Sequence, residues 1–187
     1  MAIVAGLGVL LAAASASAHV ELLSPAPRHP LNEIKDAPCG VPGSVRGEEI
    51  TVLSPGARIE VRFREYVEHP GHYRVAFDVD GDDDFRDPVC VENCDDRRQP
   101  PMAFAEDETG AVLADFVVDE EAEEQSVWVT LPEVECERCT LQLIQVMYDK
   151  RPYTSPGNDN YYACADLALR AAADEDMGSP GPDGGVG

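Results

Sequence analysis

Alternation of apolar and polar residues is the feature that most constrains how this chain can fold. Residues 59–64 and 73–79 place apolar side chains at alternate positions, as in a strand with one face on the core. Clusters of Gly, Pro and Asp separate such segments, and none longer than a turn or two has the period of an amphipathic helix. We expect the other strands at residues 20–23, 49–53, 111–118, 127–131, 140–148 and 162–169. These patterns predict an all-β fold, an antiparallel β-sandwich with long loops.

The segment 73–79 also predicts which side chains face inward. Its core side comprises Tyr73, Val75, Phe77 and Val79. His72 then shares the opposite face with Arg74 and Asp78, and we expect that face to be wet. The preceding loop contains His69 and a Pro-Gly turn, and it lies at the end of the sandwich, where functional groups gather.

The first 18 residues have the character of a secretion signal. They are apolar and small, too short and too rich in alanine for a membrane span, and end in the small-x-small pattern Ala16-Ser17-Ala18. Cleavage there would make His19 the first residue of the mature chain and residues 19–170 its single domain. Residues 171–187 are small, acidic and rich in Gly and Pro, so we expect a disordered tail.

The charge of the chain limits its partners. Lys and Arg number 14 against 36 Asp and Glu, which gives a net charge of −22. This acidity argues against nucleic acids and anionic membrane surfaces as partners, and leaves neutral polysaccharides open. No second apolar run of membrane length occurs in the sequence. We therefore expect a soluble monomer that is secreted or periplasmic.

Six cysteines in an exported chain predict disulfide bonds. We expect Cys39 to join Cys164, which would attach the N-terminal loop to the last strand. Cys90 with Cys94 and Cys136 with Cys139 are the other expected pairs, and cross-pairings such as Cys90–Cys136 stay open. The Cys-x2-Cys spacing of the last pair also resembles half of a zinc site, but no second pair of Cys or His completes it.

An aspartate-rich segment spans residues 81–101. Asp82, Asp83 and Asp84 invite a calcium interpretation, but the spacing does not match the EF-hand, which needs a glycine in mid-loop and a closing Glu. We therefore expect a solvated loop tied by the Cys90–Cys94 disulfide.

The four histidines are the candidate metal ligands, and two of them lie in one turn. The α-amine and ring of His19 at a free N-terminus can chelate one ion, and His69 or His72 would supply a third nitrogen. Nitrogen ligands of this kind suit copper(II). His29 is expected to be a surface loop histidine. From the residues alone, a solvated turn explains the His-x2-His spacing equally well.

Three motifs, taken in order, resemble those of lytic polysaccharide monooxygenases. They are His19 followed by Ser-Pro-Ala-Pro-Arg at 24–28, the His-Pro-Gly-His-Tyr turn at 69–73, and Tyr-Tyr-Ala-Cys-Ala-Asp-Leu at 161–167. A bacterial monooxygenase-like group is more similar still, through this turn and Cys-Thr-Leu-Gln at 139–142. The resemblance covers residues 19 to about 169. It implies an immunoglobulin-like or fibronectin III-like β-sandwich that carries one copper in a histidine brace. It also implies oxidative cleavage of polysaccharides such as chitin or cellulose, with electrons from an external donor.

The same resemblance implies roles for particular residues. His19 would be the bidentate copper ligand and His69 the second ligand. His72 would then be a catalytic neighbour of the metal, with the exchange of His69 and His72 as the alternative. Tyr161, three residues before the cysteine of the last motif, would be the axial aromatic residue, although packing inside a strand also explains it.

The sequence departs from that family at two points, and these keep a second hypothesis open. Asp159 is the residue closest to the position where the family often has Gln or Glu, and exposed aromatic residues are few, with Trp128 on a strand. The competing hypothesis is a non-enzymatic copper protein. Periplasmic copper-resistance proteins add an Asp-x-His ligand, but no histidine follows His72 here. Copper storage in the same brace stays open.

Overall fold

The computed structural model describes residues 20–29, 34–85, 88–90, 102–104, 110–120, 123–148 and 160–171. These residues form ten strands and no helix, which confirms the all-β prediction. Each strand expected from the sequence is present, and two short strands, at 88–90 and 102–104, were not expected. None of the described residues belongs to a helix long and apolar enough to cross a membrane. The predicted signal peptide and almost all of the predicted tail lie outside the described residues.

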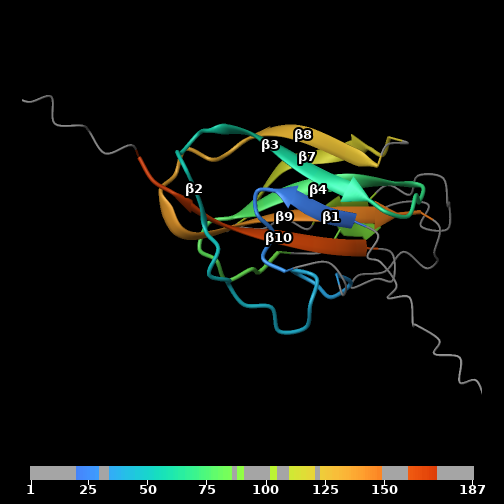
Figure 1. Cartoon of the computed structure of the whole chain (residues 1–187), viewed down its shortest axis with the longest axis horizontal. Coiled ribbons are helices and arrows are strands. Elements are labelled where there is room, and N and C mark those ends of the chain that lie inside the picture. The colour runs from blue at the N-terminus through green and yellow to red at the C-terminus, as the bar shows by residue number, and fades with distance from the viewer. Residues whose placement is uncertain are drawn as a thin grey trace, which may run out of the picture.

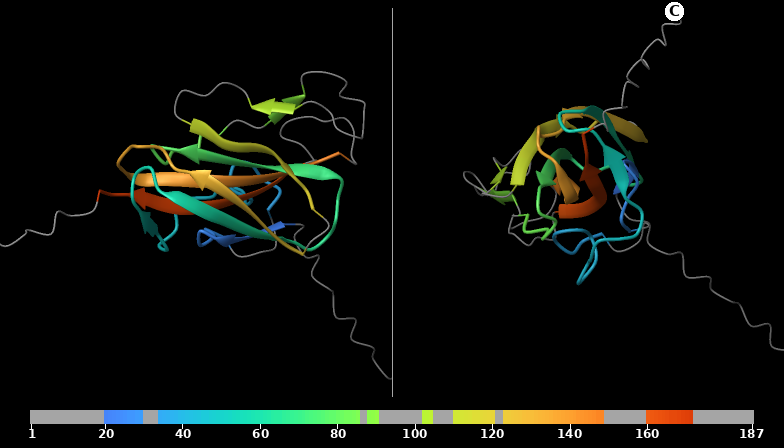
Figure 2. Two further views of the ribbon diagram at one scale, coloured as in Figure 1. Left: turned by 90° about the horizontal axis from the view of Figure 1, so that it is seen from above. Right: turned by 90° about the vertical axis from the view of Figure 1, so that its left-hand side faces the viewer.

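Two sheets face each other and make the β-sandwich (Figure 1; Figure 2). The three-stranded sheet has the order β1 (Val20–Ser24), β3 (Arg58–Glu65), β8 (Glu124–Thr130). The five-stranded sheet has the order β2 (Thr51–Leu53), β10 (Asn160–Leu169), β9 (Cys136–Met147), β4 (Gly71–Asp78), β7 (Gly110–Val118). Strands β5 (Pro88–Cys90) and β6 (Met102–Phe104) form a separate small sheet. All pairs are antiparallel except β2 with β10, which is parallel.

The core lies between the two sheets and follows the alternation of the sequence. On β4, Tyr73, Val75 and Phe77 are at most 1% exposed, and on β3 Val61 and Phe63 are fully buried. Strand β3 keeps one solvated face, as expected, because Arg58 and Arg62 point outward. Burial of such apolar side chains is the main favourable term in folding, about 25 cal/mol per Å² of apolar surface.

The polar face of β4 is not wet, so this expectation was wrong. His72 is 3% exposed, and Arg74 and Asp78 are fully buried. The reason is that both faces of the central strands are covered. The inner face packs on the core, and other parts of the chain lie over the outer face. The polar residues of β4 therefore belong to a buried polar layer, in which each charge has lost its water.

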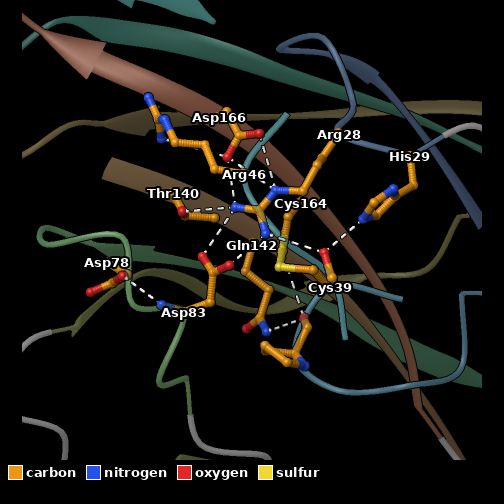
Figure 3. The surroundings of a disulfide bond; sticks show 12 residues. Arg28, His29, Cys39, Arg46, Asp78, Asp83, Thr140, Gln142, Cys164 and Asp166 are labelled. Atoms are coloured by element: carbon orange, nitrogen blue, oxygen red, sulfur yellow. Dashed lines mark hydrogen bonds and ion pairs between the residues drawn. A yellow bond between two sulfur atoms is a disulfide. The ribbon is translucent and has the colours of Figure 1, made fainter. Parts of the chain in front are cut away.

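The segment that follows β1, described at residues 25–29 and 34–50, lies over the outer face of β10 and β9, and we call it the covering segment (Figure 1). Its Arg28 is the centre of the polar layer (Figure 3). The Arg28 guanidinium donates to the Asp166 carboxylate on β10, with Nη2 at 2.6 Å, and to both carboxylate oxygens of Asp83. It also donates to Thr140 on β9 at 3.1 Å. One buried cation thereby joins the covering segment, the five-stranded sheet and the loop after β4.

A disulfide attaches the same segment to the sheet. Cys39 is bonded to Cys164 of β10, as predicted. Next to it, Gly40 has a φ of 92°, and a Cβ at this position would lie 2.6 Å from the carbonyl oxygen of Tyr162. Only glycine allows the segment to approach β10 so closely.

The other predicted disulfides have different outcomes. Cys136 is bonded to Cys139, also as predicted, which excludes the zinc half-site and the cross-pairing with Cys90. The expected Cys90–Cys94 bond lies outside the described residues.

We predict that Asp166→Asn lowers the free energy of unfolding by about 3 kcal/mol, because the buried Arg28 would keep Asp83 but lose the more deeply buried of its two anions. Urea denaturation followed by circular dichroism measures the change. The matched control is Glu137→Gln, which removes one carboxylate from the ion pair with Arg170, where the two side chains are 68% and 55% exposed. Solvent already screens that pair, so its loss should matter little. Equal losses in the two variants would contradict the role given to Asp166.

Candidate metal centre

One end of the sandwich brings together the start of the described chain and the loop that carries His69. Val20, the first residue of β1, pairs with Glu65, the last residue of β3. Four residues later, the backbone N–H of the half-buried His69 donates to Oε1 of Glu65 at 3.2 Å. His19 itself lies outside the described residues.

Glu65 is a buried carboxyl group that the sequence analysis missed. It is 7% exposed, and its Oε1 accepts a hydrogen bond from the Gln145 amide at 2.6 Å. Burial, and then the nearby carboxylate of Asp119, raise the pKa of Glu65 to about 7. A signal for it was present in the sequence, because Glu65 continues the inward positions of Ile59, Val61 and Phe63. A charged residue at a core position often marks a site.

Tyr161 lies in the same row of the five-stranded sheet. It pairs with Gln145 on β9, which pairs in turn with Tyr73 on β4. Gln145 also donates to the Tyr73 hydroxyl at 3.3 Å. Tyr161 is 3% exposed within the core cluster, and Lys35 Nζ lies 4.6 Å from the centre of its ring. Tyr161, Gln145 and Glu65 are therefore neighbours across the inner side of one end of the sandwich. Asp159 lies outside the described residues.

His72 lies on the other face of β4 from this row. Its Nδ1 is hydrogen-bonded to the Tyr148 hydroxyl, and its Nε2 is 3.8 Å from Oδ1 of Asp115. Burial, with a smaller contribution from the charge of Arg74, lowers the pKa of His72 to about 3. His72 is therefore a neutral imidazole at neutral pH. Adjacent strand residues point to opposite faces, so His72 and Tyr73 serve different sides of the sheet.

A bulge in β7 covers His72. Tyr73 pairs with Val117 and Val75 with Ala114, so that Asp115 and Phe116 both stand opposite Arg74. Phe116 has a φ of 50°, and its ring stacks on the His72 imidazole with 4.7 Å between the centres. An aromatic residue in this backbone region is strained by about 1–2 kcal/mol. Bulges of this kind redirect side chains, and this one places Phe116 over His72 and Asp115 beside Arg74.

Exposed aromatic side chains occur in two places relative to His69. Tyr66 is 39% exposed in the same loop as His69. Trp128 is 54% exposed on the outer face of the three-stranded sheet, with the Arg58 guanidinium 4.8 Å from its ring centre. It borders a hollow of about 330 Å³ next to β2 and the end of β1. Trp128 pairs with Glu60, five residues before Glu65, so it belongs to a different part of the surface from His69.

Comparisons with known proteins give a likeness of fold. No family model and no curated protein matches the sequence. Among solved structures, the chain is similar to an AA10 lytic polysaccharide monooxygenase from Streptomyces lividans, at 12% identity and a TM-score of 0.41, over 73% of this chain and 66% of that one. It is also similar to CelS2 (ScLPMO10C), a cellulose-active lytic polysaccharide monooxygenase in complex with copper, at 14% identity and a TM-score of 0.40. That match covers 66% of this chain and 55% of the other. The function therefore has to be argued from the residues of this chain.

We predict that His72 makes the folded protein sensitive to acid. Its folded pKa of about 3 lies below the unfolded value of about 6.5, so between these pH values the unfolded chain binds the extra proton. Stability should fall as the pH drops through this window, by up to about 1.4 kcal/mol per pH unit. Denaturant unfolding at a series of pH values measures the slope.

The comparison variant is His72→Asn, which keeps a polar group near Tyr148 but does not titrate. Between about pH 6.5 and pH 3, the slope of its unfolding free energy against pH should correspond to about one proton fewer than in the wild type. Glu65 works in the opposite direction, because its raised pKa costs stability as the pH rises through about 4.5 to 7. The difference between wild type and variant cancels that contribution. Parallel curves for the two proteins would show that His72 is not a buried neutral imidazole.

Proposed function

We propose that this protein is a secreted copper protein that cleaves polysaccharides oxidatively, in the manner of lytic polysaccharide monooxygenases. The observation that carries the proposal is the hydrogen bond from His69 to Glu65, the residue with which Val20 pairs. If the mature chain begins at His19, its amine and ring would then lie at the end of the sandwich that carries His69.

The donor set fits copper. One amine and two imidazoles are three nitrogen ligands, which copper(II) binds more strongly than it binds oxygen ligands such as carboxylates. His19 and His69 are the residues that would hold the ion, and bound copper would supply the one-electron and oxygen chemistry that side chains lack. Electrons would come from an external donor. The protein contributes a fixed position for each ligand, as metal sites require.

The residues around His69 have positioning roles in this proposal. Glu65 holds the backbone of the His69 loop through its Oε1, and Gln145 holds the same oxygen at 2.6 Å. Gln145 is in turn fixed by its pairing with Tyr73 and Tyr161. Tyr161 is proposed to be the aromatic residue beside the copper. The backbone of His69 is thereby anchored to both sheets, so that its position does not have to form when the ion binds.

The surface near His69 favours a neutral substrate. Tyr66 and Val67 are exposed beside it, and aromatic rings are common platforms for sugar rings. The net charge of −22 disfavours strongly anionic polysaccharides, because like charges repel on approach. We therefore propose a chitin-like or cellulose-like substrate.

We predict that His69→Ala weakens copper(II) binding at least about a hundredfold, since each metal-bound imidazole contributes several kcal/mol, and about 2.7 kcal/mol corresponds to that factor. Isothermal titration calorimetry on the mature chain measures the affinity. His29→Ala is the matched control, because the Nε2 atom of this imidazole is hydrogen-bonded to the Ser44 hydroxyl at 2.6 Å and is not part of the proposed site. Equal affinities of the two variants would refute the ligand choice. Loss of binding in His72→Ala alone would mean that the two turn histidines have exchanged roles.

We predict that an extra methionine before His19 weakens copper binding at least about tenfold, or about 1.4 kcal/mol. It converts the amine of His19 into an amide nitrogen without a basic lone pair. The authentic and extended proteins are compared by copper titration, with circular dichroism to confirm that both are folded. Equal affinity in two folded samples would contradict the brace.

The same two proteins test the activity. With copper, a reductant and chitin or cellulose, only the authentic form should release oxidised oligosaccharides, which mass spectrometry detects. Copper binding without products from either substrate would instead support a non-enzymatic copper-binding or storage protein with the same ligands.

A further inference from the structure

Two of the described aspartates on the five-stranded sheet are fully buried, and only one of these two is paired with a described cation. Asp166 on β10 forms an ion pair with Arg28, and its Oδ1 lies 3.5 Å from Nη1 of Arg46. Asp78, the last residue of β4, is equally buried, but no described Lys, Arg or His forms an ion pair with it. A buried carboxylate without a counter-ion is costly, and a protein avoids this cost by pairing the charge, protonating it or binding a metal.

One oxygen of Asp78 also lacks a hydrogen bond. Its Oδ2 accepts the backbone N–H groups of Gly81 at 2.9 Å and Asp83 at 3.2 Å, as Figure 3 shows for Asp83. Its Oδ1 is buried and accepts no hydrogen bond from any described residue. Burial raises the pKa of Asp78, because the charged form has lost its water. The carboxyl group is therefore incompletely satisfied by the residues around it.

Within the described residues 79–85, the loop after β4 adds negative charge next to this group. One carboxylate oxygen each from Asp78, Asp80 and Asp84 lie within 4.8 Å of one another. The turn that allows this passes through Gly81, which has a φ of 76° and at which a Cβ would lie 1.9 Å from the carbonyl oxygen of Arg138. Like charges at this separation repel one another, and a cation bound between the three carboxylates would turn this repulsion into attraction.

We propose that Asp78, Asp80 and Asp84 bind a calcium ion. Hard oxygen ligands at about 2.3–2.6 Å from the ion, supplied by carboxylates and completed by carbonyls and water, are what Ca²⁺ selects. The spacing of the three ligands along the chain is not that of an EF-hand, which is why the sequence analysis favoured a solvated loop. The structure adds an observation that the spacing could not give. Asp78 is buried, its Oδ1 accepts no hydrogen bond from a described residue, and the exposed carboxylates of Asp80 and Asp84 lie beside it.

The proposed ion would connect to the polar layer. Asp83, between the ligands, accepts from the guanidinium of Arg28, so fixing this loop also fixes a partner of Arg28. Asp78 ends β4, whereas the loop that carries His69 precedes it, so the two proposed metal sites lie at opposite ends of one strand. The calcium proposal therefore does not depend on the proposed copper function, and each can fail without the other.

The experiment uses the complete mature chain, freed of metal with a chelator and then titrated with calcium chloride alone. We expect calcium to raise the midpoint of thermal unfolding by roughly 5 °C at saturating concentration, as for an ion that binds only the folded state. Calorimetry should give an affinity that falls at least about tenfold in Asp80→Asn and in Asp84→Asn, because each removes one ligand charge. Magnesium at the same concentration should have a smaller effect, because it gives up its water reluctantly.

The matched control is Asp82→Asn. It removes one charge from the same loop, but Asp82 is exposed and is not one of the three ligands. Its calcium affinity and its thermal shift should equal those of the wild type within about twofold. Asp78→Asn should abolish the calcium response and, in chelator, should be at least as stable as the wild type, because it removes an unpaired buried charge. The proposal is overturned if calcium stabilises Asp80→Asn, Asp84→Asn and Asp82→Asn to the same degree, or stabilises none of the proteins. Both results are decisive even if Asp78→Asn fails to fold.

Discussion

The ion pair between Arg28 and Asp166 is the interaction on which the rest of this structure depends. Its attraction offsets a desolvation cost of similar size, so a pair of this kind adds little net stability. We infer that its main consequence is geometric, because Arg28 would lose its fully buried anion if the covering segment moved away from Asp166. Arg28 follows β1 by four residues, so the same contact limits where β1 can lie against β3. Strand β1 is therefore held by its pairing with β3 and, after its last residue, by the Arg28–Asp166 ion pair. Together these contacts keep Val20 opposite Glu65, next to the candidate metal centre.

Most of the fold could be predicted because strands with one apolar face carry a signal with a period of two residues. This signal located β3, β4 and β9, and the cysteine in the last strand pointed correctly to its bond with Cys39. The parallel pairing of β2 could not be predicted, because it depends on contacts between distant segments. The same limit explains the error at His72, Arg74 and Asp78. Alternation indicates that one face of a strand is polar, but only the whole fold decides whether that face is covered.

The candidate metal centre divides in a similar way. His69 and Tyr161 were predicted from motifs. The structure brings Tyr161 into one row with Gln145, which donates to the same Glu65 oxygen as the backbone of His69. The proposed roles of His69 and Tyr161, and that of His19, stay predictions. Glu65 and Gln145 were missed, although each interrupts an apolar alternation at an inward position. Asp78 was assigned to a solvated face for the reason given above. Polar residues at core positions of a strand are therefore the most informative residues that a periodicity analysis can single out.

The bulge at Asp115 and Phe116 has a consequence for association between molecules. β7 is one of the two edge strands of the five-stranded sheet among the described residues, and it exposes Val112, Phe116 and Val118. A straight edge strand with such side chains would be a template on which a second copy could extend the sheet. The bulge interrupts the regular spacing of backbone donors and acceptors along that edge, and it places the charged Asp115 beside the apolar residues. The backbone strain at Phe116 is thus accompanied by protection against edge-to-edge aggregation.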